Sequence, residues 1–222
     1  GIIAITLSNS RGSWLSFIIL SIVYIALIYR PFLKNNNKKT ILLMLLFSTM
    51  FALISTQTNV EERINKAIYE VQKWNAGNNL NDSNGLRLQM WKAGLTAAKE
   101  SPWIGYGYRN ANKVASEYAP KNKRIIRNKT HLHNEYITNF VSAGILGLLA
   151  LLILLFAPMI IFYQKLKDRE SYYYSSMGIL LCAGYATFGF THIAFGEEHI
   201  NAFYVLFMGF LLPRVLRGGK YI

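Results

Sequence analysis

Long apolar stretches alternate with short basic connections over much of the chain. A helix needs about 20 mostly apolar residues to cross the hydrocarbon core of a bilayer, because it rises 1.5 Å per residue. Four stretches approach or exceed that length, and a fifth is shorter but rich in Phe and Tyr. The pattern therefore predicts an all-α polytopic membrane protein with about five transmembrane helices, at residues 13–29, 40–56, 136–163, 173–193 and 200–216.

The chain opens on a further apolar run, residues 1–7, which has neither a charged leader nor a small-residue cleavage site. It is more typical of a truncated N-terminal span than of a signal peptide. We therefore expect the chain to be the C-terminal part of a longer polytopic protein. Three regions are predicted: transmembrane segments with a Ser-Arg-Gly turn in 1–56, a loop domain in 57–135, and C-terminal transmembrane segments in 136–222.

The basic residues of the short connections predict the orientation, because such connections are enriched in Lys and Arg on the cytoplasmic side. The loop 57–135 and the stretch 192–201 then face outward together with the segment around Arg11. The basic residues that carry this prediction are Arg30, Lys34, Lys38, Lys39, Lys165, Lys167, Arg169, Arg214, Arg217 and Lys220.

The outer loop has the pattern of a folded helical domain. Asn59 followed by Glu62 resembles a capping box, and apolar residues then recur at spacings of three and four until Gly77. A second helical pattern covers residues 86–100 and stops before Pro102. The sequence therefore predicts two amphipathic helices in this loop.

Composition narrows the class of protein. The chain is 52% hydrophobic and only 16% charged, which is too apolar for an ordinary soluble domain. The net charge of +13 does not indicate nucleic-acid binding, because the basic residues lie between apolar runs and no nucleic-acid motif accompanies them. The loop 57–135 has thirteen Lys and Arg against seven acids, a net +6 that suits an anionic lipid-linked ligand or an ordinary solvated loop. The single Cys182 permits no intrachain disulfide.

Three polar or aromatic features of the outward face are candidates for binding. Arg11 lies between two apolar segments, where its guanidinium either holds a phosphate or pyrophosphate or anchors a helix end. Arg87 and Trp91 are four residues apart and share one face of the second loop helix. Residues 102–108 interleave aromatics with glycines, which favours either a sugar-binding platform or an interfacial aromatic belt.

His131 and His133 end the loop and are the candidates for chemistry. Histidine suits general-base catalysis because its pKa lies near neutral, although His133 could equally anchor the helix that follows. A metal site needs more ligands than these two side chains, and no helical metal-binding spacing occurs. The sequence therefore favours a site without metal. Further ligands on the same predicted face would have to come from His192, Glu197, Glu198 and His199, to which no role is assigned.

A set of short motifs occurs in a fixed order and alternates with the predicted spans. Each motif alone is short, but their order and spacing make the combination specific. The set comprises Ser10-Arg11-Gly12, Arg87-x-x-x-Trp91, Pro102-x-x-Gly105-x-Gly107, His133-Asn134-x-Tyr136, Gly144 and Gly147.

Over about residues 1–165 this set resembles the superfamily of bacterial O-antigen ligases and O-antigen polymerases, and most of all the ligases that act on lipid A-core. The resemblance implies a metal-independent, cofactor-free inverting glycosyltransferase of the bacterial inner membrane, with its active site on the periplasmic side. The donor would be a glycan on undecaprenyl pyrophosphate and the acceptor a sugar of lipid A-core. His133 matches the family's essential histidine, expected to act as the base, and Arg11 and Arg87 match the arginines that hold the pyrophosphate.

Trp91 and Asn134, which belong to these motifs, and His131, which lies beside the matched histidine, are further expected substrate-binding residues. An O-antigen polymerase and a protein O-oligosaccharyltransferase share the same motifs and remain alternatives. A non-catalytic transporter of lipid-linked glycans is an alternative from a different class, since arginines within a membrane also line substrate paths. The expected partners are the lipid-linked donor, the lipid acceptor and membrane lipids, and no nucleic acid.

Overall fold

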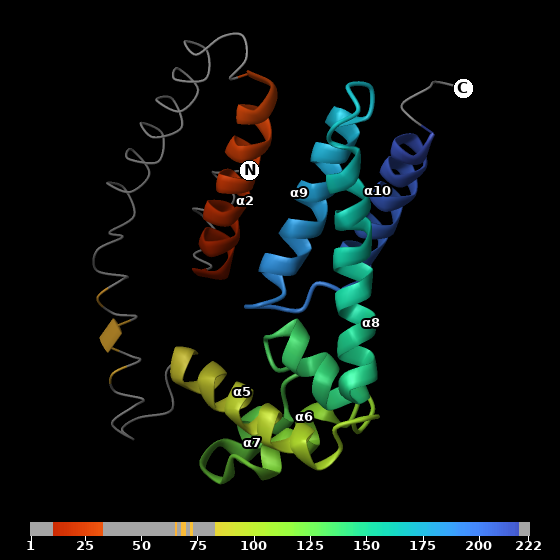
Figure 1. The fold of residues 1–222 in the computed structure, drawn as a ribbon. Helices are drawn as coiled ribbons and strands as arrows, with labels where there is room; N and C mark the ends of the chain where they lie inside the picture. Colours follow the sequence, from red (N-terminus) through yellow and green to blue (C-terminus); the bar gives the residue numbers. More distant parts are fainter. Residues whose placement is uncertain (1–10, 33–64, 66–67, 70–71, 73–82, 218–222) are drawn as a thin grey trace. The chain divides into compact units, whose positions relative to one another are not determined.

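A computed structural model describes residues 11–32, 65, 68–69, 72 and 83–217. The chain divides into two compact units, Gly1–Gly85 and Leu86–Ile222. Every regular element among the described residues is a helix, which confirms the predicted all-α class (Figure 1). The predicted division at residues 56 and 135 is not tested and stays a prediction.

The first unit contains one long described helix, α2, at Arg11–Phe32. It includes the predicted span 13–29, and its apolar part extends over Ser16–Leu27. The predicted span 40–56 lies outside the described residues. The predicted first loop helix also lies outside them, apart from residues 65, 68–69 and 72, which are helical.

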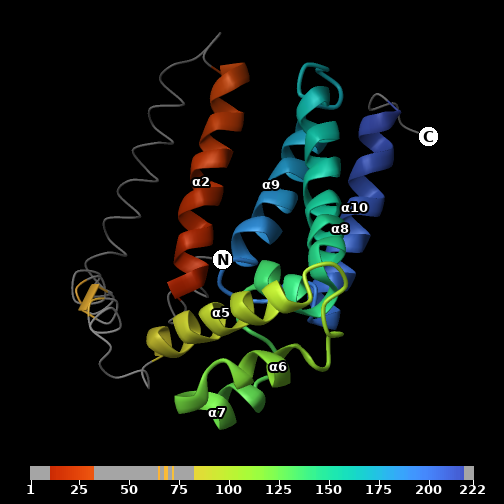
Figure 2. The same ribbon diagram turned by 60° about the horizontal axis from the view of Figure 1, so that its bottom comes forward.

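The second unit contains three long helices that lie side by side, α8 at Glu135–Lys165, α9 at Tyr172–Phe188 and α10 at Glu198–Leu216 (Figures 1 and 2). Among the described residues, α8 and α10 are long and apolar enough to cross a membrane. They match the predicted spans 136–163 and 200–216. The predicted span 173–193 ends too late, because α9 stops at Phe188 and residues 189–197 form a separate connection to α10.

Apolar side chains lie on both the inner and the outer surfaces of these helices. The contacts between α8, α9 and α10 bury Leu155, Tyr185 and Tyr204. Ile153 of α8 and Val205 of α10 are instead exposed, at 64% and 68%. A water-soluble three-helix bundle would place polar residues at such positions, whereas lipid solvates them without cost. The outward surface therefore suits a bilayer.

Shorter helices gather at the end of α8 where that helix begins (Figures 1 and 2). Helix α5, Ser83–Glu100, confirms the second predicted loop helix and ends before Pro102 as expected. Small residues dominate the core of this region and allow close packing. The elements that follow α5 were not predicted, because each is only one or two turns long: α6 at Ala111–Glu117, η1 at Pro120–Asn122 and α7 at Lys123–Arg127.

A kink interrupts α8 at Ala143 and Gly144, where the backbone leaves helical φ and ψ. In an unbroken helix the Ile145 amide would donate to the Val141 carbonyl. Here Ile145 N donates to Pro102 O at 2.7 Å, and Val141 O accepts from Tyr106 N at 2.9 Å. The loop after α5 thus inserts its own backbone into the helix ladder, a recognised cause of kinks.

The inserted loop requires glycine where the two backbones meet. Gly105 and Gly144 both have φ of +63°, and a Cβ on Gly144 would lie 2.2 Å from the carbonyl carbon of Trp103. Trp103 and Ile104 at the tip of the loop remain exposed. The sugar platform and the interfacial belt therefore both remain open interpretations of residues 102–108.

Candidate active site

Asn134 forms the boundary between the loop and α8. Its backbone is extended, and its side-chain oxygen accepts from Ile137 N at 2.9 Å, so Asn134 is the N-cap of the helix. The same side chain donates to Phe190 O at 3.1 Å. Helix capping is therefore carried out by Asn134, which leaves the His133 side chain available for another role.

Glu135, the first residue of α8, binds the connection between α9 and α10, residues 189–197. Its amide donates to Gly189 O at 2.7 Å. One oxygen of its buried carboxylate accepts from Ala194 N at 2.6 Å and from Phe195 N at 3.0 Å. The other oxygen accepts from Asn139 Nδ2 at 2.9 Å. These bonds hold the α9–α10 connection against the start of α8.

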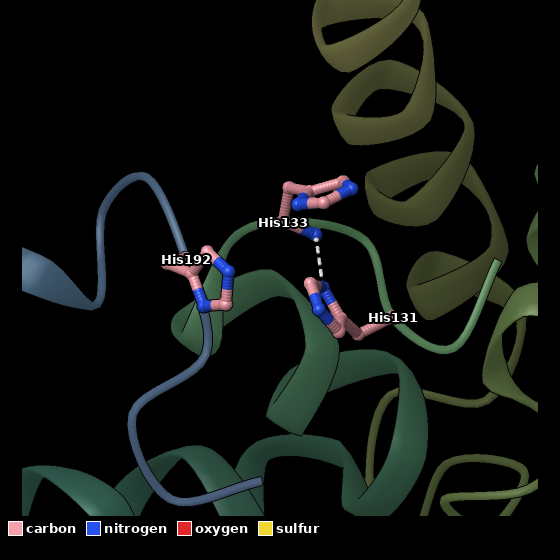
Figure 3. A group of neighbouring side chains, drawn as sticks. All are labelled: His131, His133 and His192. Carbon is pink, nitrogen blue, oxygen red and sulfur yellow. Dashed lines mark hydrogen bonds between the residues drawn. The ribbon is translucent and has the colours of Figure 1, made fainter. Parts of the chain in front are cut away.

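The connection brings His192 next to His131 and His133, and these three side chains form what we call the histidine cluster (Figure 3). The ring centroids of His131 and His133 are 4.4 Å apart, and those of His192 lie 5.1 and 5.9 Å from them. One ring nitrogen from each residue lies within 4.8 Å of the other two. Two sequence-distant segments thus contribute to one site.

His133 adopts a left-handed backbone conformation, with φ of 52°. Histidine is among the few non-glycine residues that visit this region more often than average. The amide of His133 donates to His131 Nδ1 at 3.1 Å, shown as the dashed line in Figure 3. Neutral His131 therefore carries its proton on Nε2. His131 supports the turn that presents His133.

Both loop histidines have pKa values below the ordinary value. Burial, as the largest cause, and the charges of His131, Arg87, His192 and Lys129 together lower the pKa of His133 to about 4. Burial and the charge of His192 lower the pKa of His131, against an opposing effect of Glu197. His133 is therefore neutral at physiological pH and has a lone pair with which to accept a proton.

Helix α5 supplies Arg87 and Trp91, as the sequence predicted for one helix face. Trp91 Nε1 donates to Leu132 O at 3.0 Å, which ties the helix to the loop between the two histidines. Arg87 is close enough for its charge to lower the pKa of His131 and His133. A fixed cation thus accompanies the neutral base.

The structure does not relate every predicted site residue to this cluster. Arg11 begins α2 in the first unit, and its side chain is not among those described. His199 is exposed on the first turn of α10. Sequence reasoning assigned no role to His192, although its place on the same predicted face was the available signal. Whether His131, Trp91 and Asn134 contact substrate stays a prediction.

The histidine cluster is also the group of described residues that could hold a metal ion. Two features oppose a cation there. His131 Nδ1 is already engaged by the His133 amide, and the charges of Arg87 and Lys129 reach the cluster. That the site works without metal remains a prediction.

Over the described residues, these features define a helical protein that has two helices long and apolar enough to cross a membrane and a histidine-containing site at the start of one of them. Residues 1–152 match the family described as O-antigen ligase, and the chain belongs to that family.

Two curated proteins are similar to the chain. It is 29% identical over 167 residues to an uncharacterized protein of Haemophilus influenzae (strain Rd), covering 74% of this chain and 41% of that protein. It is 24% identical over 168 residues to an O-antigen ligase of Escherichia coli (strain K12), covering 72% and 39%. The chain thus spans about two fifths of the length of these relatives.

Proposed function

We propose that the protein is a glycosyltransferase that moves a glycan from undecaprenyl pyrophosphate to a sugar of lipid A-core. The observation that carries the proposal is the neutral His133 at the start of α8, with the charge of Arg87 close by. The family match and the lipid-compatible helices support a lipid-linked substrate. The basic short connections support an inner-membrane protein whose site faces the periplasm.

In the proposed reaction, His133 removes the proton of the acceptor hydroxyl as its oxygen attacks the anomeric carbon. The new carbon–oxygen bond forms while the bond to pyrophosphate breaks, and the bonding electrons leave with the pyrophosphate. Attack opposite the leaving group inverts the anomeric configuration. Arg87, and Arg11 from the matched Ser-Arg-Gly motif, stabilise the negative charge that develops on the departing group.

We expect Arg87→Ala to weaken donor binding on the order of 100-fold, because a bidentate hydrogen bond to a phosphate would be lost. Arg87→Lys should recover only part of the affinity, since lysine keeps the charge but not the fork of donors. Binding of the lipid-linked donor to the full-length protein in nanodiscs measures both. Arg11→Ala, tested in the same way, should also weaken binding. Unchanged donor affinity in both alanine variants would refute the arginine clamp.

The pH dependence of transfer provides a second test. A lowered pKa means that the neutral base persists below the ordinary histidine value of 6.5 and is lost as pH falls through about 4. The acid limb of kcat/KM against pH should therefore have its midpoint near 4. A midpoint at 6.5 would indicate that His133 is not the base in the environment described.

The acceptor distinguishes a ligase from a polymerase in cells that lack the gene. We expect loss of all polymer from lipid A-core and accumulation of polymer on the lipid carrier. A core capped by single repeat units would instead indicate a polymerase, and glycan missing from proteins would indicate a protein O-oligosaccharyltransferase. Glycan transfer by the purified protein, supplied only with donor and acceptor, separates all of these enzymes from a transporter.

A further inference from the structure

His192 lies in a part of the chain that the family match does not include, since that match ends at residue 152. It nevertheless lies beside His133, with ring centroids 5.9 Å apart (Figure 3). The bonds of Glu135 fix the backbone on both sides of it, at Gly189 and at Ala194 and Phe195. Its location is therefore determined by several bonds and not by one loop contact.

The hydrogen bonds of His192 leave one nitrogen available to the cluster. His192 Nδ1 lies 3.1 Å from Ile193 O, and because a carbonyl only accepts, Nδ1 must donate. In the neutral ring the lone pair is then on Nε2. A histidine oriented by a backbone carbonyl in this way is a hydrogen-bond acceptor on its other side.

The Nδ1 atom of His133 has no backbone carbonyl to orient it, unlike that of His192. Its Nδ1 is buried and has no hydrogen-bond partner, whereas the residue as a whole is only partly buried. A substrate hydroxyl can therefore approach only Nε2. For Nε2 to carry the lone pair, Nδ1 must carry the proton, and a buried N–H without an acceptor is costly.

We propose that His192 is a positioning residue of the active site, whose Nε2 accepts the Nδ1–H of His133, and that Glu135 holds His192 in place. The inference rests on the proposed function of His133 as the base. One ring nitrogen of each histidine in the cluster lies within 4.8 Å of the other two, a distance that one bridging water or a small ring rotation closes. His192 thereby selects the tautomer of His133 that has a free Nε2.

Transfer by the full-length protein in nanodiscs tests this role at a pH where His133 is neutral. His192→Ala should lower kcat on the order of 10- to 100-fold with little change in KM, as expected when a buried N–H is left without an acceptor. His192→Gln keeps an acceptor oxygen and should recover most of kcat. His199→Ala is the matched control, because this histidine is exposed outside the cluster, and it should leave kcat unchanged. Wild-type kcat in His192→Ala, or equal losses in the two His192 variants, would overturn the role.

A second measurement does not depend on turnover. The rate at which diethyl pyrocarbonate modifies His133, followed by mass spectrometry against pH, reports the pKa of this side chain. The groups that act on it are Arg87, Lys129, His131 and His192, and all of them lower its pKa together with burial. Removing His192 takes away one charge and some burial, so in both His192 variants the midpoint should rise from about 4 toward 6.5. An unchanged midpoint would show that His192 does not adjoin His133.

Glu135 is tested by its coupling to His192. Glu135→Ala should reduce kcat and raise the His133 midpoint as His192→Ala does, and Glu135→Gln should recover part of the loss because one oxygen still accepts both amides. The double variant should be little worse than His192→Ala, since Glu135 acts through that residue. Additive losses would show that Glu135 has a general structural role instead. If His133→Ala retained full turnover, the proposed function would fail while the modification midpoints still reported whether the two histidines interact.

Discussion

Replacing His133 by alanine is expected to abolish glycan transfer while leaving donor binding intact. A positioned general base contributes on the order of 10²- to 10⁴-fold to a rate. His131 donates from Nε2 in its neutral form and is buried, so it is not placed to accept the proton. Single-turnover transfer from lipid-linked donor to lipid A-core, with donor affinity measured in parallel, provides the test.

His131→Ala serves as the comparison for this variant. It removes the acceptor of the His133 amide and loosens the turn, so we expect a smaller loss than for His133→Ala. The wild-type enzyme should also keep its rate in the presence of a strong chelator. Full turnover by His133→Ala, or loss of wild-type activity on chelation, would contradict a metal-free base mechanism.

Replacing Gly144 by alanine is expected to have the largest effect on folding. The residue has φ of 63° and ψ of −159°, a region that is essentially restricted to glycine, and an added Cβ would lie 2.2 Å from Trp103. Backbone strain and overpacking together should cost about 2–6 kcal/mol. The apparent melting temperature in detergent should fall by roughly 10 °C, the shift expected for a loss of this size in a chain of this length.

Gly209→Ala is the matched control for this change. Gly209 lies in α10, and a Cβ there would meet nothing within 4 Å. Alanine in a helix interior is more favourable than glycine, so stability should be unchanged or slightly higher. Equal melting temperatures for Gly144→Ala and the wild type would show that the loop after α5 does not insert into α8.

The membrane helices could be predicted because hydrophobicity alone determines them. The apolar stretch from 136 to 163 needs no tertiary information to be helical, and α8 covers it. The kink within it could not be predicted. Its cause is a backbone exchange with Pro102 and Tyr106, residues far away in the sequence, and a glycine in a transmembrane helix is too common to indicate a kink by itself.

The candidate site was predictable in part, because some of its residues are placed by local sequence alone. His133 and Arg87 belong to local motifs, and each is placed by the helix that it begins or lies on. His192 belongs to no motif, and only the hydrogen bonds of Glu135 to the α9–α10 connection bring it to the cluster. Asn134 illustrates the reverse case, a motif residue for which the structure shows a capping role that the sequence did not suggest.

The attachment of the α9–α10 connection to Glu135 has a consequence for engineering acceptor specificity by exchanging segments between relatives. A crossover placed after residue 152, where the family match ends, would separate His192 from the helix start that holds it. The α9–α10 connection of the relative would then have to donate two amides to the Glu135 carboxylate, as Ala194 and Phe195 do here. Crossovers placed before His131 would instead transfer Glu135 and the α9–α10 connection together. Hybrids made in this way should retain a correctly assembled histidine cluster.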